Sequence, residues 1–180
     1  MGERQQELLE LLDKSGARLH ALLTRLTLRE DAAEELMQDL FIRLNGAKDQ
    51  GGIDCWHAYA RRTAINLAFD WRRRQARRRS GSLTGLPECA SDDSTPLGRL
   101  IQSEEIEQVL AAIDRLSGVS REALVMRYIQ QDSYDEIAEQ LGKTVHQVRA
   151  LCFRAMSNLR EMLGRNHWPA DGKGVQRVEH

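Results

Sequence analysis

The sequence has few of the residues that characterise disulfide-rich, metal-binding or β-rich proteins. Its 180 residues include only three cysteines, three prolines and 5% aromatic residues. Cys55, Cys89 and Cys152 are odd in number and widely spaced, which provides neither a disulfide framework nor the paired clusters of a zinc site. We therefore expect reduced, structural cysteines. The low content of proline and aromatic residues favours helices over sheets.

Long apolar runs and catalytic motifs are also missing. No run approaches the roughly 20 apolar residues that a membrane span needs, and the first residues, MGERQQELLELL, are amphipathic rather than typical of a signal peptide. The sequence has no glycine-rich phosphate loop, nucleophile motif or metal-binding cluster. We predict a cytoplasmic protein without membrane insertion that is not an enzyme and needs no metal or cofactor.

Charge is present but segregated along the chain. The formal net charge is only −1, but residues 61–79 are strongly basic, with eight arginines and a single acid, Asp70. The predicted helix that contains these arginines also carries Trp56, Tyr59, Phe69 and Trp71. Arginines interleaved with aromatic rings neutralise phosphates and stack on unpaired bases. This pattern predicts a helix that binds nucleic acid.

Apolar residues at helical spacing predict an all-α protein of two small domains. Residues 1–79 form the first domain and residues 100–163 the second, joined by a polar, glycine-containing linker over 80–99 and followed by a tail over 164–180. Helices are expected over about 3–25, 30–44, 55–74, 104–116 and 120–129. Thr27 and Glu30 have the spacing of a capping box that would open the second of these helices.

The second domain contains the pattern of a helix-turn-helix. A capping box at Ser133–Glu136, a terminating Gly142 and a second box at Thr144–Gln147 outline two short helices joined by a tight turn. In a DNA complex, glutamine would contact adenine edges and arginine would contact guanine or phosphate. The alternative is an ordinary helical hairpin. The residues that project from the outer face of the second helix are His146, Gln147, Arg149, Ala150, Phe153 and Arg154.

These motifs resemble those of a known family. Residues 133–142, continuing through Val148 to Leu159, are similar to region 4 of extracytoplasmic-function sigma factors. Residues 31–41 are similar to regions 2.1 and 2.2 of the same family, and residues 59–74 to regions 2.3 and 2.4. The resemblance covers nearly the whole chain except the linker and the tail. It implies a factor that gives RNA polymerase its promoter specificity.

The resemblance also implies sites and partners. It places binding to the clamp coiled coil of the polymerase β′ subunit on Glu35, Gln38 and Asp39, and it implies contact of region 4 with the β flap. Recognition of the −10 promoter element falls on Asp54, Trp56, Tyr59, Arg62, Asn66, Arg72, Arg73 and Arg74. Recognition of the −35 element falls on Thr144, His146, Gln147, Arg149, Ala150, Phe153 and Arg154. An anti-sigma factor is a further expected partner.

The sequence departs from the family pattern at two places, and alternatives to this interpretation stay open. Family members often carry a cation where this chain has Leu151, and a hydroxyl where it has Ala150. Many have Trp-Leu-Tyr-Arg where this chain has Tyr59 to Arg62, so the promoter sequence does not transfer. A repressor or activator that binds only duplex DNA through residues 133–160 is the main alternative. Trp56 and Tyr59 would then be core residues, and the acidic helix a solvated face or an adaptor surface.

Overall fold

The structure is a computed structural model that describes residues 3–47, 53, 55–81 and 96–164. All regular elements in these ranges are helices, which confirms the all-α prediction. They are α1 (Glu3–Thr27), α2 (Glu30–Ala47), α3 (Trp56–Gly81), α4 (Pro96–Asp114), α5 (Gly118–Leu124), the π-helical turn η1 (Val125–Ile129), α6 (Tyr134–Leu141) and α7 (Val145–Leu163).

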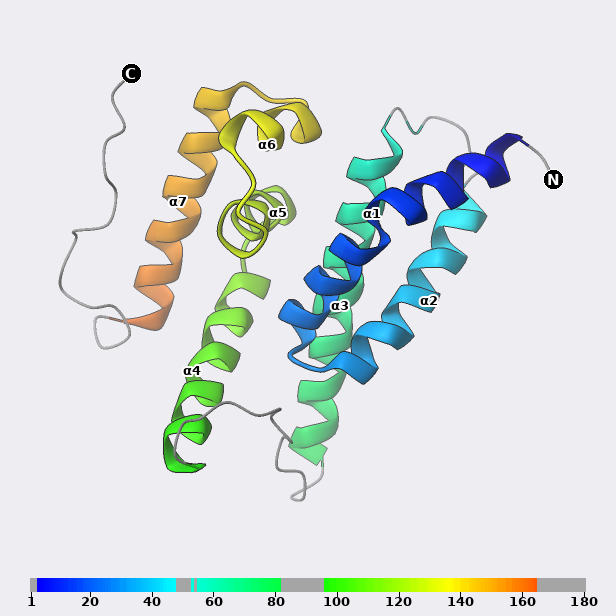
Figure 1. Cartoon of the computed structure of the whole chain (residues 1–180). Helices are drawn as coiled ribbons and strands as arrows, with labels where there is room; N and C mark the ends of the chain where they lie inside the picture. Colours follow the sequence, from blue (N-terminus) through cyan, green and yellow to red (C-terminus); the bar gives the residue numbers. More distant parts are fainter. Residues whose placement is uncertain (1–2, 48–52, 54, 82–95, 165–180) are drawn as a thin grey trace.

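The helices form two groups that lie side by side (Figure 1). Helices α1, α2 and α3 pack on one another, and α5, α6 and α7 pack together with α4 against α7. In α1 the leucines recur every three or four residues, so Leu19, Leu22, Leu23 and Leu26 share one buried face. The two groups correspond to the two helical domains that the sequence predicts.

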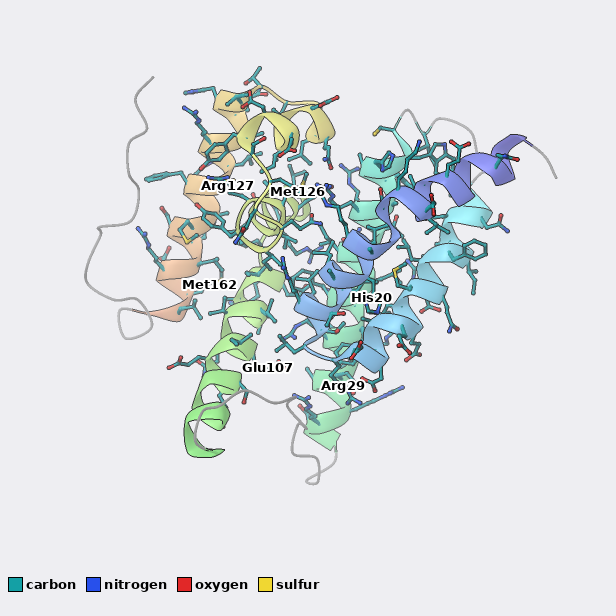
Figure 2. The ribbon with its side chains drawn as sticks, in the orientation of Figure 1. His20, Arg29, Glu107, Met126, Arg127 and Met162 are labelled. Carbon is teal, nitrogen blue, oxygen red and sulfur yellow. The ribbon has the colours of Figure 1, made fainter. Side chains whose placement is uncertain are left out.

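The groups share a hydrophobic core. Leu110 and Ile113 of α4, with Leu116 just after this helix, belong to the same buried cluster as the leucines of α1 and α2 and Phe69 of α3. A smaller cluster lies within the second group, around Met126, Ile137, Val148 and Cys152. Figure 2 shows side chains filling the space between the two groups. The second group is therefore anchored on the first by apolar burial.

Two helices extend beyond their predicted ends. Helix α3 continues to Gly81 instead of ending near residue 74, because arginine, glutamine and alanine all favour helix and no breaker occurs before the glycine. Helix α4 begins at Pro96, inside the segment expected to be linker. Proline is favoured in the first turn of a helix, where its missing N–H is not needed.

The predicted capping box at Thr27 does not form. Thr27 is buried and belongs to α1, and its hydroxyl donates a hydrogen bond of 2.8 Å to the carbonyl oxygen of Leu23. The backbone then turns at Leu28, which has a φ of 60°, and α2 begins at Glu30. The prediction was wrong because burial of Thr27 keeps it within the preceding helix, where its hydroxyl bonds backward along the chain.

Candidate nucleic-acid interface

A groove at the end of α2 and the first half of α3 brings together three of the eight predicted −10 residues. Tyr59, Arg62 and Asn66 are spaced by about one helical turn and lie on one face of α3. They line the groove together with Thr63, and α2 contributes Arg43, Gly46 and Ala47. We call this feature the strand-binding groove. It combines an aromatic ring, a cation and an amide within one concave surface.

The aromatic wall of the groove is fixed by packing. The rings of Trp56 and Tyr59 meet edge to face with their centroids 6.0 Å apart. Both side chains are half-buried and pack against the main hydrophobic cluster. They are therefore partly core residues, as the alternative interpretation required, and they also keep exposed surface beside the groove.

Arg62 and Asn66 are in contact with the second helix group. The Nε atom of Arg62 donates to the two carboxylate oxygens of Glu122 at 3.1 and 3.4 Å. Arg121 donates to Oδ1 of Asn66 at 3.2 Å, and its guanidinium lies over the ring of Phe69 at 5.0 Å from the centroid. Burial raises the pKa of Glu122, while the charge of Arg62 acts in the opposite direction.

The arginines further along α3 divide between internal and exposed roles. Arg72 donates to the carbonyl oxygen of Leu26 at 3.1 Å and to Glu107 of α4 at 2.6 Å, and its side chain is 9% exposed. Arg73 pairs with Asp70 and Asp114. Arg74 is exposed. Of these three predicted DNA contacts, two hold α4 against α3 in this structure, and Arg74 faces solvent.

The outer face of α2 carries the predicted polymerase contacts. Glu35 and Gln38 are exposed and Asp39 is half-buried. Phe41 and Ile42 extend this face with side chains that are 42% and 66% exposed. Neither residue was predicted as a contact, although both fall outside the spacing of the buried leucines of α2, which marks them as exposed apolar residues.

The helix-turn-helix has the local geometry that the sequence predicts. The amide of Glu136 donates to the Ser133 hydroxyl at 3.2 Å, and the Glu136 carboxylate accepts from the Ser133 amide at 2.7 Å. This last bond lowers the pKa of Glu136. Gly142 ends α6 with a φ of 59°, a conformation that favours glycine. The Thr144–Gln147 capping box forms in the same way at the start of α7.

The outer face of α7 is accessible in this arrangement. His146, Arg149, Phe153 and Arg154 are exposed, with Phe153 72% exposed, and Ala150 is half-buried. The guanidinium of Arg149 lies 5.3 Å from the centroid of the Tyr134 ring. The Gln147 side-chain oxygen accepts from the Thr144 amide at 2.9 Å, so only its NH₂ group remains for a base edge. A paired contact with adenine would require Gln147 to leave its capping bond.

Known proteins match both helix groups. Residues 11–78 match the family model Sigma-70 region 2, and residues 106–159 match Sigma-70, region 4. The RNA polymerase sigma-E factor of Streptomyces avermitilis is 31% identical over 150 residues, which cover 82% of this chain and 78% of that protein. The chain belongs to the extracytoplasmic-function sigma factors.

Other sigma factors of this type support the assignment. The ECF RNA polymerase sigma factor SigE of Mycolicibacterium smegmatis is 29% identical over 161 residues, covering 87% of this chain but 62% of that protein, less than two thirds of its length. The RNA polymerase sigma factor YlaC of Bacillus subtilis is 29% identical over 82% of its length. Among solved structures, the sigma factor RpoE in complex with the anti-sigma factor NepR from Bartonella quintana has the same fold, with a TM-score of 0.50 and 24% identity over 88% of this chain and 95% of that chain.

Several residues and segments considered in the sequence lie outside the described ranges. These are Asp54 of the predicted −10 site, Cys89, most of the linker and the tail after residue 164. Within the described ranges, Cys152 is buried, as expected of a structural cysteine, whereas Cys55 is exposed. The same ranges contain no helix long and apolar enough to span a membrane and no cluster of side chains that could hold a metal ion.

Proposed function

We propose that the two helix groups of this sigma factor bind different parts of a promoter. Residues 1–79 bind core RNA polymerase and capture the non-template strand of the −10 element, and residues 100–163 bind the −35 element as duplex DNA. Residues 80–99 link them. The chain performs no catalysis and acts in the cytoplasm, where the polymerase and the chromosome are found.

The strand-binding groove is the observation that carries this proposal. An unpaired base needs an aromatic wall for stacking, an amide that forms hydrogen bonds with its edge and a cation for the adjacent phosphate. Tyr59, Asn66 and Arg62 supply these three groups on one surface. Binding of the unpaired strand offsets the few kcal/mol needed to unstack a base. Opening of the promoter therefore needs no hydrolysis step.

The proposed partners follow from the exposed faces of the two groups. The exposed acids of α2, together with Phe41 and Ile42, form a mixed apolar and polar surface suited to a helical partner such as the β′ clamp coiled coil. We expect the second helix group to bind the β flap of RNA polymerase. Two solved structures of the same fold are complexes: the sigma factor RpoE is bound to the anti-sigma factor NepR, and CnrH is bound to the cytosolic domain of CnrY. We expect an anti-sigma factor for this chain as well.

Transcription in vitro tests the proposal as a whole. The full chain is combined with core RNA polymerase on a pool of genomic promoter fragments, and the transcripts are sequenced. We expect transcripts that start downstream of a shared pair of −35 and −10 motifs. A regulator that binds only duplex DNA would yield none.

A double substitution tests the groove itself. Tyr59→Ala with Asn66→Ala should leave polymerase binding and the closed complex nearly intact, yet abolish permanganate-detectable opening at the −10 element, because the stacking and base-edge contacts form only after the strands part. Tyr59→Phe is the matched control, since it keeps the ring and the contact with Trp56. A pre-melted promoter should not rescue the double variant. Normal opening by the double variant would remove these residues from the strand-binding site.

A further inference from the structure

Tyr134 begins α6 and lies beside two arginines of the second helix group. The guanidinium of Arg127, in η1, is 4.4 Å from the centroid of its ring, and that of Arg149, in α7, is 5.3 Å from it. The face of an aromatic ring carries partial negative charge and attracts a guanidinium within about 6 Å. One tyrosine ring therefore joins three elements of the helix-turn-helix region, and it offsets the repulsion between the two like charges.

The ring is held in place more firmly than Arg149. Tyr134 directly follows Ser133, the capping residue of α6, and its half-buried side chain packs against the smaller hydrophobic cluster. Arg127 is also half-buried and donates a hydrogen bond of 2.9 Å to the carbonyl oxygen of Asp132. Arg149 is exposed. Arg149 is thus the one of these three side chains that can move freely unless the ring restrains it.

Contact with a ring leaves the hydrogen-bonding groups of an arginine available. The N–H donors lie in the plane of the guanidinium, whereas a ring attracts its flat face. Within the described ranges, no ion pair with a carboxylate occupies the donors of Arg149. Arg149 can therefore bind an acceptor on DNA while its guanidinium stays beside Tyr134.

Arg154, further along the outer face of α7, provides a comparison. It is exposed like Arg149, but in the part of the chain that the structure describes neither an aromatic ring nor a carboxylate contacts it. An exposed arginine loses rotamer freedom when DNA fixes it, and a side chain that is already held in its binding orientation loses less. The two arginines should therefore differ in how much ordering DNA must impose on them.

We propose that Tyr134 is a positioning residue of the −35 surface, whose ring holds Arg149 in its DNA-binding orientation before the duplex arrives. The inference rests on the −35 role proposed for α7 and adds the source of that orientation. Arg127 supports the ring, and Arg149 makes the contact with DNA. Ordering one long side chain costs about two- to tenfold in affinity, and the loss of the ring should have an effect of this size.

Substitutions at one position separate the ring from its hydroxyl. Tyr134→Leu and Tyr134→Met remove the ring and keep an apolar side chain, whereas Tyr134→Phe keeps the ring and removes the hydroxyl. Thermal melting followed by circular dichroism checks that each variant is folded. Either of the two variants without a ring is sufficient for the test.

The affinity measurement asks whether the effect of the ring depends on Arg149. Each substitution is made in the full chain in three backgrounds: the parent, Arg149→Ala and Arg154→Ala. Fluorescence anisotropy at one salt concentration then measures binding to a −35 duplex from the promoter pool. We expect the variants without a ring to bind about two- to tenfold more weakly in the parent and in Arg154→Ala, with no further loss in Arg149→Ala. Tyr134→Phe should bind like the parent.

The free protein gives a second readout. An aromatic ring shifts the NMR signals of protons that lie over its face. The δ-methylene signals of Arg149 should therefore be displaced in the parent and in Tyr134→Phe, and should move close to those of Arg154 in Tyr134→Leu. This displacement reports orientation in the absence of DNA, and a change in stability alone would not alter it.

Four results would overturn the proposal. Unchanged affinity without the ring would show that the ring does not assist binding, and an equal loss in the Arg149→Ala background would show that Tyr134 acts without Arg149. An equal loss in Tyr134→Phe would assign the effect to the hydroxyl. Undisplaced Arg149 signals in the parent would show that the contact is absent in solution.

The −35 role of α7 is tested separately from this positioning role. Weaker duplex binding by Arg149→Ala with Arg154→Ala would leave the proposed function standing even if Tyr134 proved not to position Arg149. Unchanged binding by that double variant would overturn both the −35 role of this face and the positioning role that rests on it.

Discussion

The two helices predicted to bind DNA differ in which contacts hold their outer faces. The outer face of α7 is exposed, and its capping box is complete within its own helix group. The predicted strand-binding face of α3 is also exposed at Arg62 and Asn66, but Glu122 accepts from Arg62 and Arg121 donates to Asn66 across the contact between the groups. The start of α7 is thus held by bonds within its own helix group, whereas these residues of α3 are held by side chains of the other group as well.

The shared core provides the largest test of this comparison. Phe69 is fully buried in the cluster common to both groups, and Phe69→Ala should lower the free energy of unfolding by about 3–5 kcal/mol. Because α4 packs on the same cluster, we expect both groups to unfold together. Circular dichroism should then show a single unfolding transition with its midpoint at a lower denaturant concentration. Met126→Ala, in the smaller cluster, is the comparison variant. Two separate transitions in either variant would show that the groups fold independently.

The exposed face of α7 gives the next largest effect. Arg149→Ala with Arg154→Ala should weaken binding to −35 duplex DNA and reduce the slope of log affinity against log salt by about two units, one for each lost phosphate contact. Fluorescence anisotropy at several salt concentrations measures the slope. Arg160→Ala, on the last turn of the same helix, serves as a control for the loss of a cation. An unchanged slope in the double variant would remove this face of α7 from the DNA interface.

A smaller effect is expected at Gln147, where one substitution distinguishes a contact with a base from capping of α7. Glutamate preserves the side-chain oxygen that accepts from the Thr144 amide but lacks the NH₂ donor. Gln147→Glu should therefore melt at nearly the same temperature as the parent and yet select a different −35 sequence from a promoter pool. Gln147→Ala loses both functions and gives the reference for stability. The same selected sequence for Gln147→Glu would assign this side chain to capping alone.

The smallest effect is a pH dependence of the first capping box. The Ser133 amide lowers the pKa of Glu136 in the folded chain, so this contribution to stability is present above the ordinary glutamate value of 4.5 and decreases as the pH falls through the lowered pKa. Glu136→Gln keeps a capping box of the kind formed by Thr144 and Gln147, and its side chain does not titrate. Thermal melts at pH 3 to 6 should show a steeper fall in melting temperature with falling pH for the parent than for Glu136→Gln. Equal slopes would show that the bond to Glu136 is absent in solution.

The helix-turn-helix could be predicted because its determinants are local. The side chains that cap α6 and α7 lie three residues from their partners, and Gly142 ends α6 without help from distant residues. The face shared by Tyr59, Arg62 and Asn66 followed in the same way from helical spacing. Thr27 was misjudged because its surroundings depend on how α1 packs. Asp132 and Arg18 are 114 residues apart, and no pattern of neighbouring residues identifies such a pair.

The place of Asp132 in the chain also affects the protein while it is being made. The arginines of α3 leave the ribosome before residue 132 is synthesised, and the first helix group can close much of its own core by then. During that interval Arg18 and Arg61 lack the carboxylate that each of them binds in the finished chain. The ion pairs of Asp132 that join the two helix groups therefore form only after most of the chain has been made.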